Sequence, residues 1–416
     1  MTLIEEASAT HMVSAGSVRM KKPIRLLTFS TLYPNSQRPA HGVFVENRLR
    51  HLVAGGEAAS TVLAPVPWFP LRSSSFGDWA RHAAVPKQDV RYGLAMHHPR
   101  YPVIPRIGMS VAPLLLYRAA AVAVEKLVAG GLQFDLIDAH YLYPDGVAAV
   151  WLGRRFGKPV VVTARGSDVS LLPRYHVPRR LIQGAIAGAD ALISVSAGLK
   201  EGLVALGAPA DKVMVLRNGV DLEMFHPVID RAAARAELGL GEGPTLLSAG
   251  HLIERKGHNH VIEALGMLPG HTLVVVGEGP ERGALQDLAR RLGVADRVRL
   301  LGACPHYRMP LYYTAADVLV LASSREGWAN VLLEAMACGT PVVASPAWGS
   351  REAVRAPEAG LVLGEVTAKA IADGVRHLLA APPAREATRR YAAGFGWDET
   401  TAGQIAVFRR VLGQVQ

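Results

Sequence analysis

Short apolar runs rich in β-branched residues alternate with helical patterns along almost the whole of this 416-residue chain. Helical stretches include residues 44–52, 114–128 and 282–292. Strands that alternate with helices pair in parallel, with the helices on both faces of the sheet. The sequence therefore predicts an α/β protein built from doubly wound parallel sheets. The candidate strands are residues 24–30, 60–66, 90–97, 135–140, 160–163, 191–195, 213–216, 245–248, 272–276, 298–301, 318–321 and 341–344.

The chain is longer than one hydrophobic core usually supports, so we expect two domains. A break falls near Asn218-Gly219-Val220-Asp221, which a polar stretch follows. Ligands of doubly wound sheets bind at the carboxyl ends of the strands, which places the expected site in the cleft between the domains. Residues 66–110 show no clear periodicity and are predicted to form a long insertion facing that cleft. The predicted divisions are a flexible tail (1–22), an N-terminal domain (23–215), a C-terminal domain (216–385) and a last helical segment (386–416).

The formal net charge is +10, and the whole excess lies within residues 1–213. Such asymmetry is typical of contact with an anionic membrane surface, although a dispersed solvated surface explains it equally well. The basic residues are scattered without interleaved aromatics, which argues against nucleic-acid binding.

Neither cysteine usage nor hydropathy indicates a secreted or membrane-spanning protein. Cys304 and Cys338 show no metal-ligand spacing, so we expect a reducing cytosol. The longest apolar stretch, residues 107–128, is interrupted by charged residues and a proline, so no transmembrane helix is predicted.

Two carboxylates, Glu326 and Glu334, stand eight positions apart, with a glycine directly after the first and a helical pattern between them. Gly339 suits the C-terminal cap of this helix. The amides that precede its first turn lie at a positive helix end, where a phosphate binds readily. These amides belong to Gly327, Trp328, Ala329, Asn330 and Val331.

This arrangement resembles the E-x7-E element of retaining glycosyltransferases of family 4, which use nucleotide-diphospho-sugars. The resemblance implies that Glu326 faces the donor sugar and that Glu334 holds the ribose hydroxyls. It spans nearly the whole chain, because Asn218-Gly219-Val220-Asp221 and Phe395-Gly396-Trp397-Asp398 also look like family motifs.

The segment from Gly250 to Gly257 follows a strand and resembles the family pattern G-R-L-x-x-x-K-G. Arg255 and Lys256 would stabilise the diphosphate charge that grows as the sugar departs. His251 occupies the usual arginine position, and it stays open whether His251 or Arg255 replaces that guanidinium. By itself the segment would read as an ordinary solvated loop.

Three glycines are further candidates for donor binding. Gly277 and Gly279 follow the end of a strand, and the resemblance implies that they lie directly beneath the bound nucleotide. Gly42 lies between the first strand and a helix, where members of the family have a glycine loop that contacts the donor phosphates. A tight turn is the alternative explanation at each position.

Polar residues end two strands on the acceptor side of the predicted cleft. Arg165 stands where many family members have a histidine; it stays protonated, so it can bind a phosphate or a hydroxyl but cannot act as a base. Asp168 is a candidate partner of Arg165 or of an acceptor hydroxyl, and His140 a second acceptor-side candidate. A loop-capping ion pair and a buried structural histidine are the alternatives.

The resemblance implies the GT-B fold, two Rossmann-like domains facing across a cleft, with the last helix (386–416) crossing back to the first domain. It also implies transfer of a sugar to an acceptor hydroxyl with retention. No D-x-D pair occurs, so we expect no metal and no cofactor beyond the nucleotide-diphospho-sugar donor. A lipid-linked sugar acceptor in cell-surface polysaccharide or glycolipid assembly would suit a cytoplasmic enzyme on the inner face of the membrane. A nucleotide-sugar 2-epimerase and a non-catalytic sugar-nucleotide-binding subunit are the alternatives.

Overall fold

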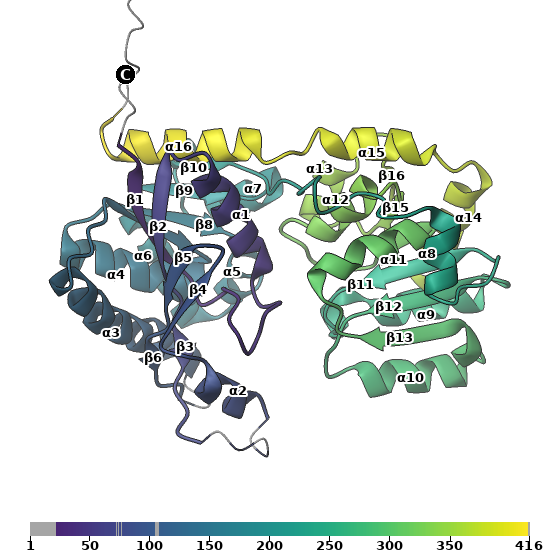
Figure 1. The fold of residues 1–416 in the computed structure, drawn as a ribbon, viewed down its shortest axis with the longest axis horizontal. Coiled ribbons are helices and arrows are strands. Elements are labelled where there is room, and N and C mark those ends of the chain that lie inside the picture. Colours follow the sequence, from purple (N-terminus) through teal and green to yellow (C-terminus); the bar gives the residue numbers. More distant parts are fainter. Residues whose placement is uncertain (1–21, 72, 74, 76, 105–107, 415–416) are drawn as a thin grey trace, which may run out of the picture.

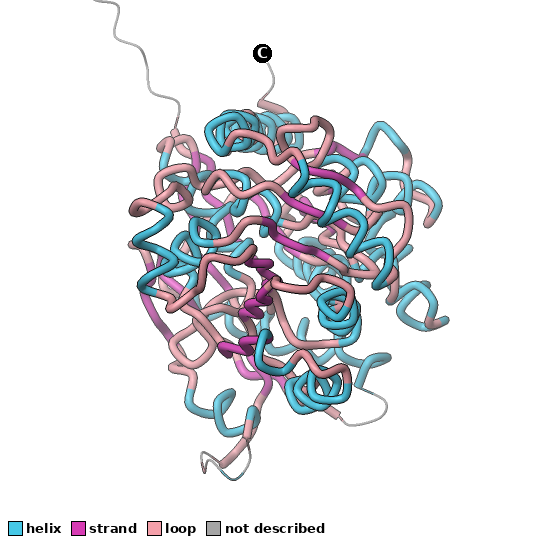
Figure 2. Tube along the Cα trace, turned by 90° about the vertical axis from the view of Figure 1, so that its right-hand side faces the viewer, coloured by secondary structure: helices cyan, strands magenta, loops and turns pink. Residues whose placement is uncertain are grey.

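The computed structural model describes residues 22–71, 73, 75, 77–104 and 108–414. Two α/β domains lie side by side, each built around one sheet (Figure 1). Viewed from the side of the second domain, helices surround the strands (Figure 2). The predicted pair of doubly wound sheets is confirmed. The predicted flexible tail falls outside the described residues, apart from Lys22.

The first sheet has eight strands within the described residues, and all neighbours are parallel except the last pair. Residues 90–97 were predicted as one strand, which is wrong. Tyr92 and Gly93 both adopt positive φ, 50° and 77°, and turn the chain into an antiparallel hairpin. In spatial order the strands are β10 (Val213–Val215), β9 (Ala191–Ser194), β8 (Val160–Ala164), β7 (Leu136–His140), β1 (Ile24–Phe29), β2 (Ala58–Leu63), β5 (Leu94–His97) and β4 (Gln88–Arg91).

Both faces of this sheet are covered, because successive side chains of a strand point to opposite faces. Leu26 of β1 packs into one apolar cluster and Leu27 into another. Helices α1 (Val43–Ala54) and α16 (Asp398–Val411) contribute to the first cluster. The opposite face packs against α3 (Gly108–Ala129), α4 (Val147–Phe156) and α6 (His176–Gly188).

The predicted long insertion at residues 66–110 contains regular structure. Besides the β4–β5 hairpin, β3 (Val66–Pro67) pairs in parallel with β6 (Arg100–Tyr101), and α2 (Asp78–Ala84) packs on β3. These pieces are short, which explains why the sequence shows no sustained period there.

The second sheet has six parallel strands within the described residues. Helices α9 (His258–Gly266), α10 (Arg282–Arg291) and α14 (Ala368–Ala380) pack on one face. Helices α11 (Met309–Ala315) and α12 (Asn330–Ala337) pack on the other. The strand order is β13 (Val298–Gly302), β12 (Thr272–Val276), β11 (Thr245–Ala249), β14 (Val318–Leu321), β15 (Val342–Ala344) and β16 (Gly360–Val362).

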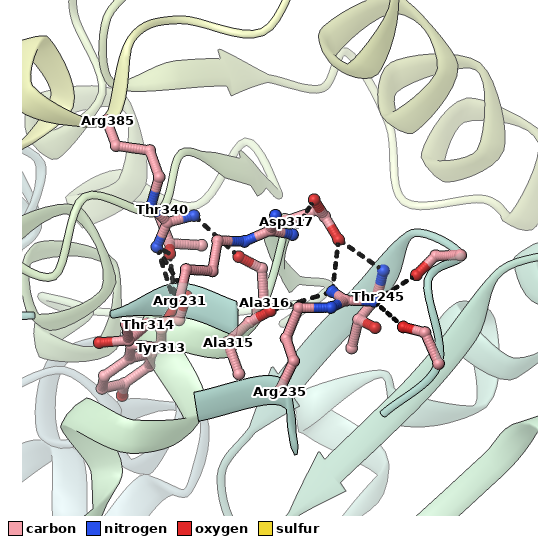
Figure 3. A network of polar contacts seen from close by, with 12 residues as sticks. Arg231, Arg235, Thr245, Tyr313, Thr314, Ala315, Ala316, Asp317, Thr340 and Arg385 are labelled. Carbon is pink, nitrogen blue, oxygen red and sulfur yellow. Dashed lines mark hydrogen bonds and ion pairs between the residues drawn. The ribbon is translucent and has the colours of Figure 1, made fainter. Parts of the chain in front are cut away.

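A polar network at the amino ends of β11 and β14 fixes two outer helices to this domain (Figure 3). Asp317 accepts hydrogen bonds from Arg231 and Arg235 of α8 (Arg231–Glu237) and from the Thr245 amide. Arg385, which begins α15 (Arg385–Ala393), donates to Ala316 O at 3.0 Å and to three further carbonyls. The network lies at the strand ends opposite to those where ligands bind, so its role is structural.

Two segments cross between the domains and touch each other. The first segment leads from β10 of the first domain to β11 of the second. The second segment lies near the end of the chain and leads from α15, which lies over the second domain, back to α16, which lies over the first (Figure 1). Val220 N donates to Phe395 O at 2.9 Å, and a Cβ on Gly219 would lie 2.7 Å from the Gly396 carbonyl carbon. The two crossings therefore form one packed hinge.

Helix α7 (Ala197–Ala205) of the first domain is in direct contact with α13 (Trp348–Ala353) of the second. The Trp348 side chain lies across Gly198, where a Cβ would be 2.8 Å from its ring. Glu352 Oε1 accepts the amides of Ala197 and Gly198, the first turn of α7, at 2.7 and 3.2 Å. A carboxylate of one domain thus caps a helix of the other.

Candidate active site

A cavity of about 930 Å³ lies between the domains, at the carboxyl ends of their strands. Its lining combines the loop after β8, the loop and turn after β11 and the loop before α12. No described residue of 66–110 lines it, so the insertion that was predicted to face the cleft contributes nothing to the wall of this cavity. The predicted site residues that line it are Arg165, Arg255, Lys256, Glu326, Gly327, Trp328, Ala329, Asn330 and Val331.

The loop before α12 touches the first domain through glycine. A Cβ on Gly327 would lie 2.1 Å from Arg165 O, and one on Gly349 would lie 2.6 Å from Gly327 O. Helix α12 begins at Asn330 and has no side-chain N-cap. Its first amides are therefore left for a ligand at the positive end of the helix.

Glu326 and Lys256 form a close ion pair on the cavity wall. Lys256 Nζ donates to Glu326 Oε1 at 2.6 Å, and Arg255 Nη1 lies 3.6 Å from the same oxygen. Burial alone would raise the pKa of Glu326, but attraction to Lys256 and Arg255 outweighs it and the pKa lies below its usual range. Glu326 is therefore an anion at neutral pH, flanked by two cations.

Glu334 does not line this cavity, and its residue is only 8% exposed. Tyr313 donates its hydroxyl to Glu334 Oε2 at 2.8 Å, and His306 Nε2 lies 3.2 Å from Oε1. Burial lowers the pKa of His306, but attraction to Glu334 raises it by more than burial lowers it. The net shift of the pKa is therefore upward. Local sequence pattern indicates neither contact, because each joins residues more than twenty positions apart.

The remaining donor-side candidates also lie outside the cavity lining. A Cβ on Gly277 would be 1.8 Å from Gly250 O, and one on Gly279 would be 2.3 Å from Leu252 O. Gly42 has φ 73°, and a Cβ there would meet Leu32 O at 2.3 Å. Backbone packing therefore requires glycine at all three positions, whatever else they do.

The two candidate replacements for the family arginine are placed differently. His251 is exposed and lies outside the cavity lining. Arg255 lines the cavity, and its Nη1 donates to Arg325 O at 2.7 Å. The geometry therefore puts the guanidinium of Arg255, rather than the His251 ring, beside Glu326.

Arg165 is held by a buried network behind the cavity. Its Nη1 donates to Asn218 Oδ1 at 3.1 Å and its Nη2 to His140 Nδ1 at 2.7 Å. A guanidinium only donates, so His140 Nδ1 must be the unprotonated nitrogen. His140 Nε2 then faces Asp138 Oδ2, 3.2 Å away.

The burial of this network sets its charges. Burial lowers the pKa of His140 despite the attraction of Asp138, so the ring is neutral. Burial, and next repulsion from Arg48, lowers the pKa of Arg165 to about 9, which leaves it protonated at neutral pH. His140 itself lies outside the cavity lining and acts on the cavity only through Arg165.

Asp168 is buried and accepts hydrogen bonds from backbone amides. Its oxygens lie 2.9 Å from Leu142 N, 3.1 Å from Arg165 N and 2.6 Å from Gly166 N. The contact with Arg165 is thus with its backbone and not with its guanidinium. Asp168 shapes the loop that presents Arg165, and its carboxylate does not line the cavity.

Sequence reasoning missed several lining residues. The cavity lining also includes Trp348, Arg174, Arg179 and Tyr141. Asn218 lines it too, although its motif was interpreted as architectural. None stands in a recognisable local pattern except Asn218. Among the described residues, no group of three or more His, Cys, Asp or Glu side chains could hold a metal ion.

Comparisons with known proteins identify the family of this chain. The family described as "Glycosyl transferases group 1" matches residues 230–395, and "Glycosyltransferase Family 4" matches residues 68–224. The chain is 34% identical to D-inositol 3-phosphate glycosyltransferase 1 of Catenulispora acidiphila, over 67% of this chain and 73% of that protein. The D-inositol 3-phosphate glycosyltransferase of Frankia alni is 35% identical over 67% of this chain and 75% of its own length.

Solved structures show the same fold. Sucrose-phosphate synthase from Thermosynechococcus elongatus superimposes with a TM-score of 0.77 at 21% identity, covering 95% of this chain and all of that one. HepE of Anabaena in complex with UDP-glucose has a TM-score of 0.69 at 19% identity, covering 94% of this chain and 99% of its own. The predicted fold is thereby confirmed, and the chain belongs to the family 4, group 1 type of glycosyltransferases with the GT-B fold.

Proposed function

We propose that this glycosyltransferase moves a sugar from a nucleotide-diphospho-sugar to an acceptor hydroxyl and retains the configuration of the anomeric carbon. The observation on which this proposal depends is the pairing of Glu326 with Lys256 and Arg255 beside the free amino end of α12. A neighbour of the same fold was solved with UDP-glucose bound, which supports this donor class.

In the proposed complex the donor diphosphate lies against the first amides of α12. Lys256 and Arg255 then face the negative charge that appears on the leaving phosphate as the sugar departs. Fixed positive groups that are partly buried in a protein stabilise such charge more than they would in bulk solvent. Glu326 holds the lysine in place and accepts hydrogen bonds from sugar hydroxyls.

Retention by two displacements would require a carboxylate nucleophile near the anomeric carbon. Glu326 is the one carboxylate among the described lining residues, and it is already paired with Lys256. We therefore propose substitution on one face. The bond from the anomeric carbon to phosphate breaks, the bond to the acceptor oxygen forms on the same side, and the acceptor proton passes to the departing phosphate.

The proposed reaction needs no metal ion. Hard divalent cations require clustered oxygen ligands, and cations of the protein face the diphosphate position instead. Activity with the preferred donor should therefore persist in excess EDTA. Loss of activity in EDTA that Mg²⁺ restores would contradict this part of the proposal.

We also propose peripheral contact with an anionic membrane that presents a lipid-linked acceptor for surface polysaccharide or glycolipid assembly. The support is a set of exposed apolar side chains on the insertion, including Trp68 (54% exposed) and Trp79 (41%). None of the helices within the described ranges is both long and apolar enough to cross a bilayer. Flotation with acidic liposomes should fall when both tryptophans are replaced by serine, and equal flotation on neutral liposomes would contradict the idea.

The central test is a donor panel followed by product analysis. Thermal shift with UDP-, GDP- and ADP-sugars identifies the donor, because bound ligand raises the apparent stability. Proton NMR of the first-formed product then reads its anomeric configuration. An inverted product, or no stabilisation by any sugar nucleotide, would refute the proposal.

A further inference from the structure

We propose that Gln404, in the C-terminal helix α16, is a positioning residue for sugar transfer. Through Arg48 and Asn218 it fixes the guanidinium of Arg165 at the cavity wall. Neither Gln404 nor Arg48 lines the cavity, so both act on it only through other residues. This inference rests on the proposed function and names residues outside the cavity that hold the proposed site in place.

A closed ring of polar side chains lies behind the cavity. Its members come from α1, β7, the loop after β8, the segment between β10 and β11, and α16, so the ring joins elements from both ends of the chain. Each member contacts the next, and the last contacts the first: Arg48, Asn218, Arg165, His140, Asp138 and Gln404.

Arg48 connects α16 to the segment that crosses between the domains. Its Nε donates to Gln404 Oε1 at 2.8 Å, and its Nη1 donates to Leu216 O at 3.0 Å and to Asn218 Oδ1 at 3.2 Å. Gln404 Nε2 donates in turn to Asp138 Oδ2 at 3.2 Å. Arg48 and Gln404 are each 1% exposed, so water offers them few alternative partners.

The donor and acceptor roles within the ring allow a single arrangement. A guanidinium only donates, so the side-chain oxygens of Asn218 and Gln404 must face the arginines, and their amide nitrogens must point away. The amide nitrogen of Asn218 then donates to Asn330 Oδ1 at 3.3 Å. By the same reasoning, His140 presents its unprotonated Nδ1 to Arg165 and carries its proton on Nε2. A ring without an alternative arrangement holds its guanidinium groups in one place.

Asn218 connects this ring to cavity-lining residues of both domains. Arg165 belongs to the first domain, Asn330 begins α12 of the second, and both line the cavity, as Asn218 does. Loss of the hydrogen bond from Arg48 would free the Asn218 amide and with it the support of Arg165. A change in α16 therefore reaches the cavity through side chains that are fixed one by another.

The ring also buries donors that it does not use. Arg165 Nε and Arg48 Nη2 are buried, and neither has a hydrogen-bond partner among the described residues. An unpaired buried donor costs stability. A ring that served only to attach α16 would gain nothing from two guanidinium groups, whereas a fixed cation at the cavity wall stabilises charge in a bound substrate.

The central measurement is the effect of Gln404→Met on kcat and on nucleotide affinity. The donor is whichever of UDP-, GDP- and ADP-glucose stabilises the parent most, and turnover is read as release of its nucleoside diphosphate with water as the acceptor. Gln404→Met keeps the length of the side chain but removes both hydrogen bonds. We expect kcat to fall about 10- to 10²-fold, because a group in the site is misplaced. The Kd of the nucleoside diphosphate should change less than about 2-fold, since Lys256 and Glu326 lie outside the ring.

A double-mutant cycle tests whether the effect passes through Arg165. In an Arg165→Gln background, Gln404→Met should lower kcat by less than about a further 2-fold, because the group that it positions is already absent. A merely structural role of Gln404 would give the same loss in both backgrounds. Full multiplication of the two losses would therefore overturn the inference, as would a loss confined to nucleotide affinity.

His140 gives a second readout, which needs no turnover. Long-range 1H–15N NMR of histidine-labelled protein reports which ring nitrogen carries the proton, and the His140→Gln variant identifies the signal by its absence. The parent should show His140 with a proton on Nε2 alone, and Gln404→Met should lose this single form. An unchanged signal would overturn the inference, and this comparison decides if the parent does not hydrolyse its donor.

Arg409→Met is the matched control on the same helix. It removes the ion pair between α16 and Glu57 of the first domain, which lies outside the ring, so kcat and the His140 signal should equal those of the parent. Arg48→Lys is the second variant if Gln404→Met does not fold. It keeps the buried charge, but an ammonium group cannot reproduce the directions in which the guanidinium bonds Gln404 and Asn218. It should give the same loss of kcat and the same lack of additivity with Arg165→Gln.

The two proposals fail in different ways. If none of the three donors binds the parent, the proposed function is removed and this inference with it. If the parent binds and turns over a donor while Gln404→Met and Arg48→Lys keep normal kcat, this inference alone is overturned.

Discussion

Lys256 Nζ lies 2.6 Å from Glu326 Oε1, although seventy positions separate the two residues in the chain. The pair joins the turn after β11 to the loop before α12, and both side chains are mostly buried, with 16% and 10% of their surfaces exposed. Removal of either partner leaves the other charge poorly solvated, so the pair works as a unit.

Replacing Lys256 with Ala should lower kcat at least about 10²-fold, because a fixed charge near the leaving phosphate is lost. Glu326→Gln should lower kcat similarly, and the double variant should be little worse than either single one. Steady-state kinetics with the preferred donor checks both statements. Lys369→Ala is the control, since Lys369 pairs with Asp373 on an exposed helix surface. Fully additive losses in the double variant would show that the two residues act separately.

Gly327→Ala should disturb the contact between the domains and lower kcat/KM at least about 10-fold. The new methyl group would lie 2.1 Å from Arg165 O, so the loop before α12 or the loop after β8 must move. Gly283→Ala is the matched control, because nothing lies within 4 Å of its Cβ position in α10. That control should be neutral or more stable, by up to about 1 kcal/mol. Normal turnover in Gly327→Ala would contradict the close approach of the domains.

Asp317→Ala should lower the free energy of unfolding by about 1–3 kcal/mol, because Arg231 and Arg235 lose the carboxylate that pairs with them (Figure 3). The kinetic constants should change little at temperatures where the variant is folded, since the network lies away from the cavity. Asp287→Ala, which breaks an exposed pair with Arg290, should change stability by less than about 0.5 kcal/mol. Urea unfolding measures both, and equal effects of the two variants would contradict the structural role.

His258 should make stability depend on pH in mildly acidic solution. Burial, and next repulsion from Lys256, lowers the pKa of His258 to about 4, whereas an unfolded histidine titrates near pH 6.5. Between these values the unfolded chain binds the additional proton, so the free energy of unfolding rises with pH, by at most about 1.4 kcal/mol per pH unit. His258→Gln should make this slope smaller, although buried His41, whose pKa is also lowered to about 4, keeps part of it. His176→Gln, at an exposed position, should leave the slope unchanged. If His258→Gln leaves the slope of unfolding free energy against pH unchanged, His258 does not contribute to this pH dependence and the prediction is wrong.

The local sequence pattern was sufficient to predict most helices and strands and some of the residues that line the cavity. The period of apolar residues gave both sheets, and the helix predicted after Glu326 runs from Asn330 to Ala337, with Gly339 at φ 79° just beyond its end. Local pattern failed at residues 90–97, where two positive φ values turn an apparent strand into a hairpin.

The sequence by itself determined the family, the two-domain organisation and the segments that hold Lys256 and Glu326. Each of these follows from motifs and periodic patterns formed by residues that are close together in the chain. Only the tertiary structure decided that Glu334 is buried against Tyr313 and that Arg165 rests on His140 and Asn218. It alone placed Arg174 and Arg179 in the lining of the same cavity as Glu326. These relations join residues far apart in the chain, and they exist only once the burial of apolar surface has fixed two domains and a hinge in one arrangement.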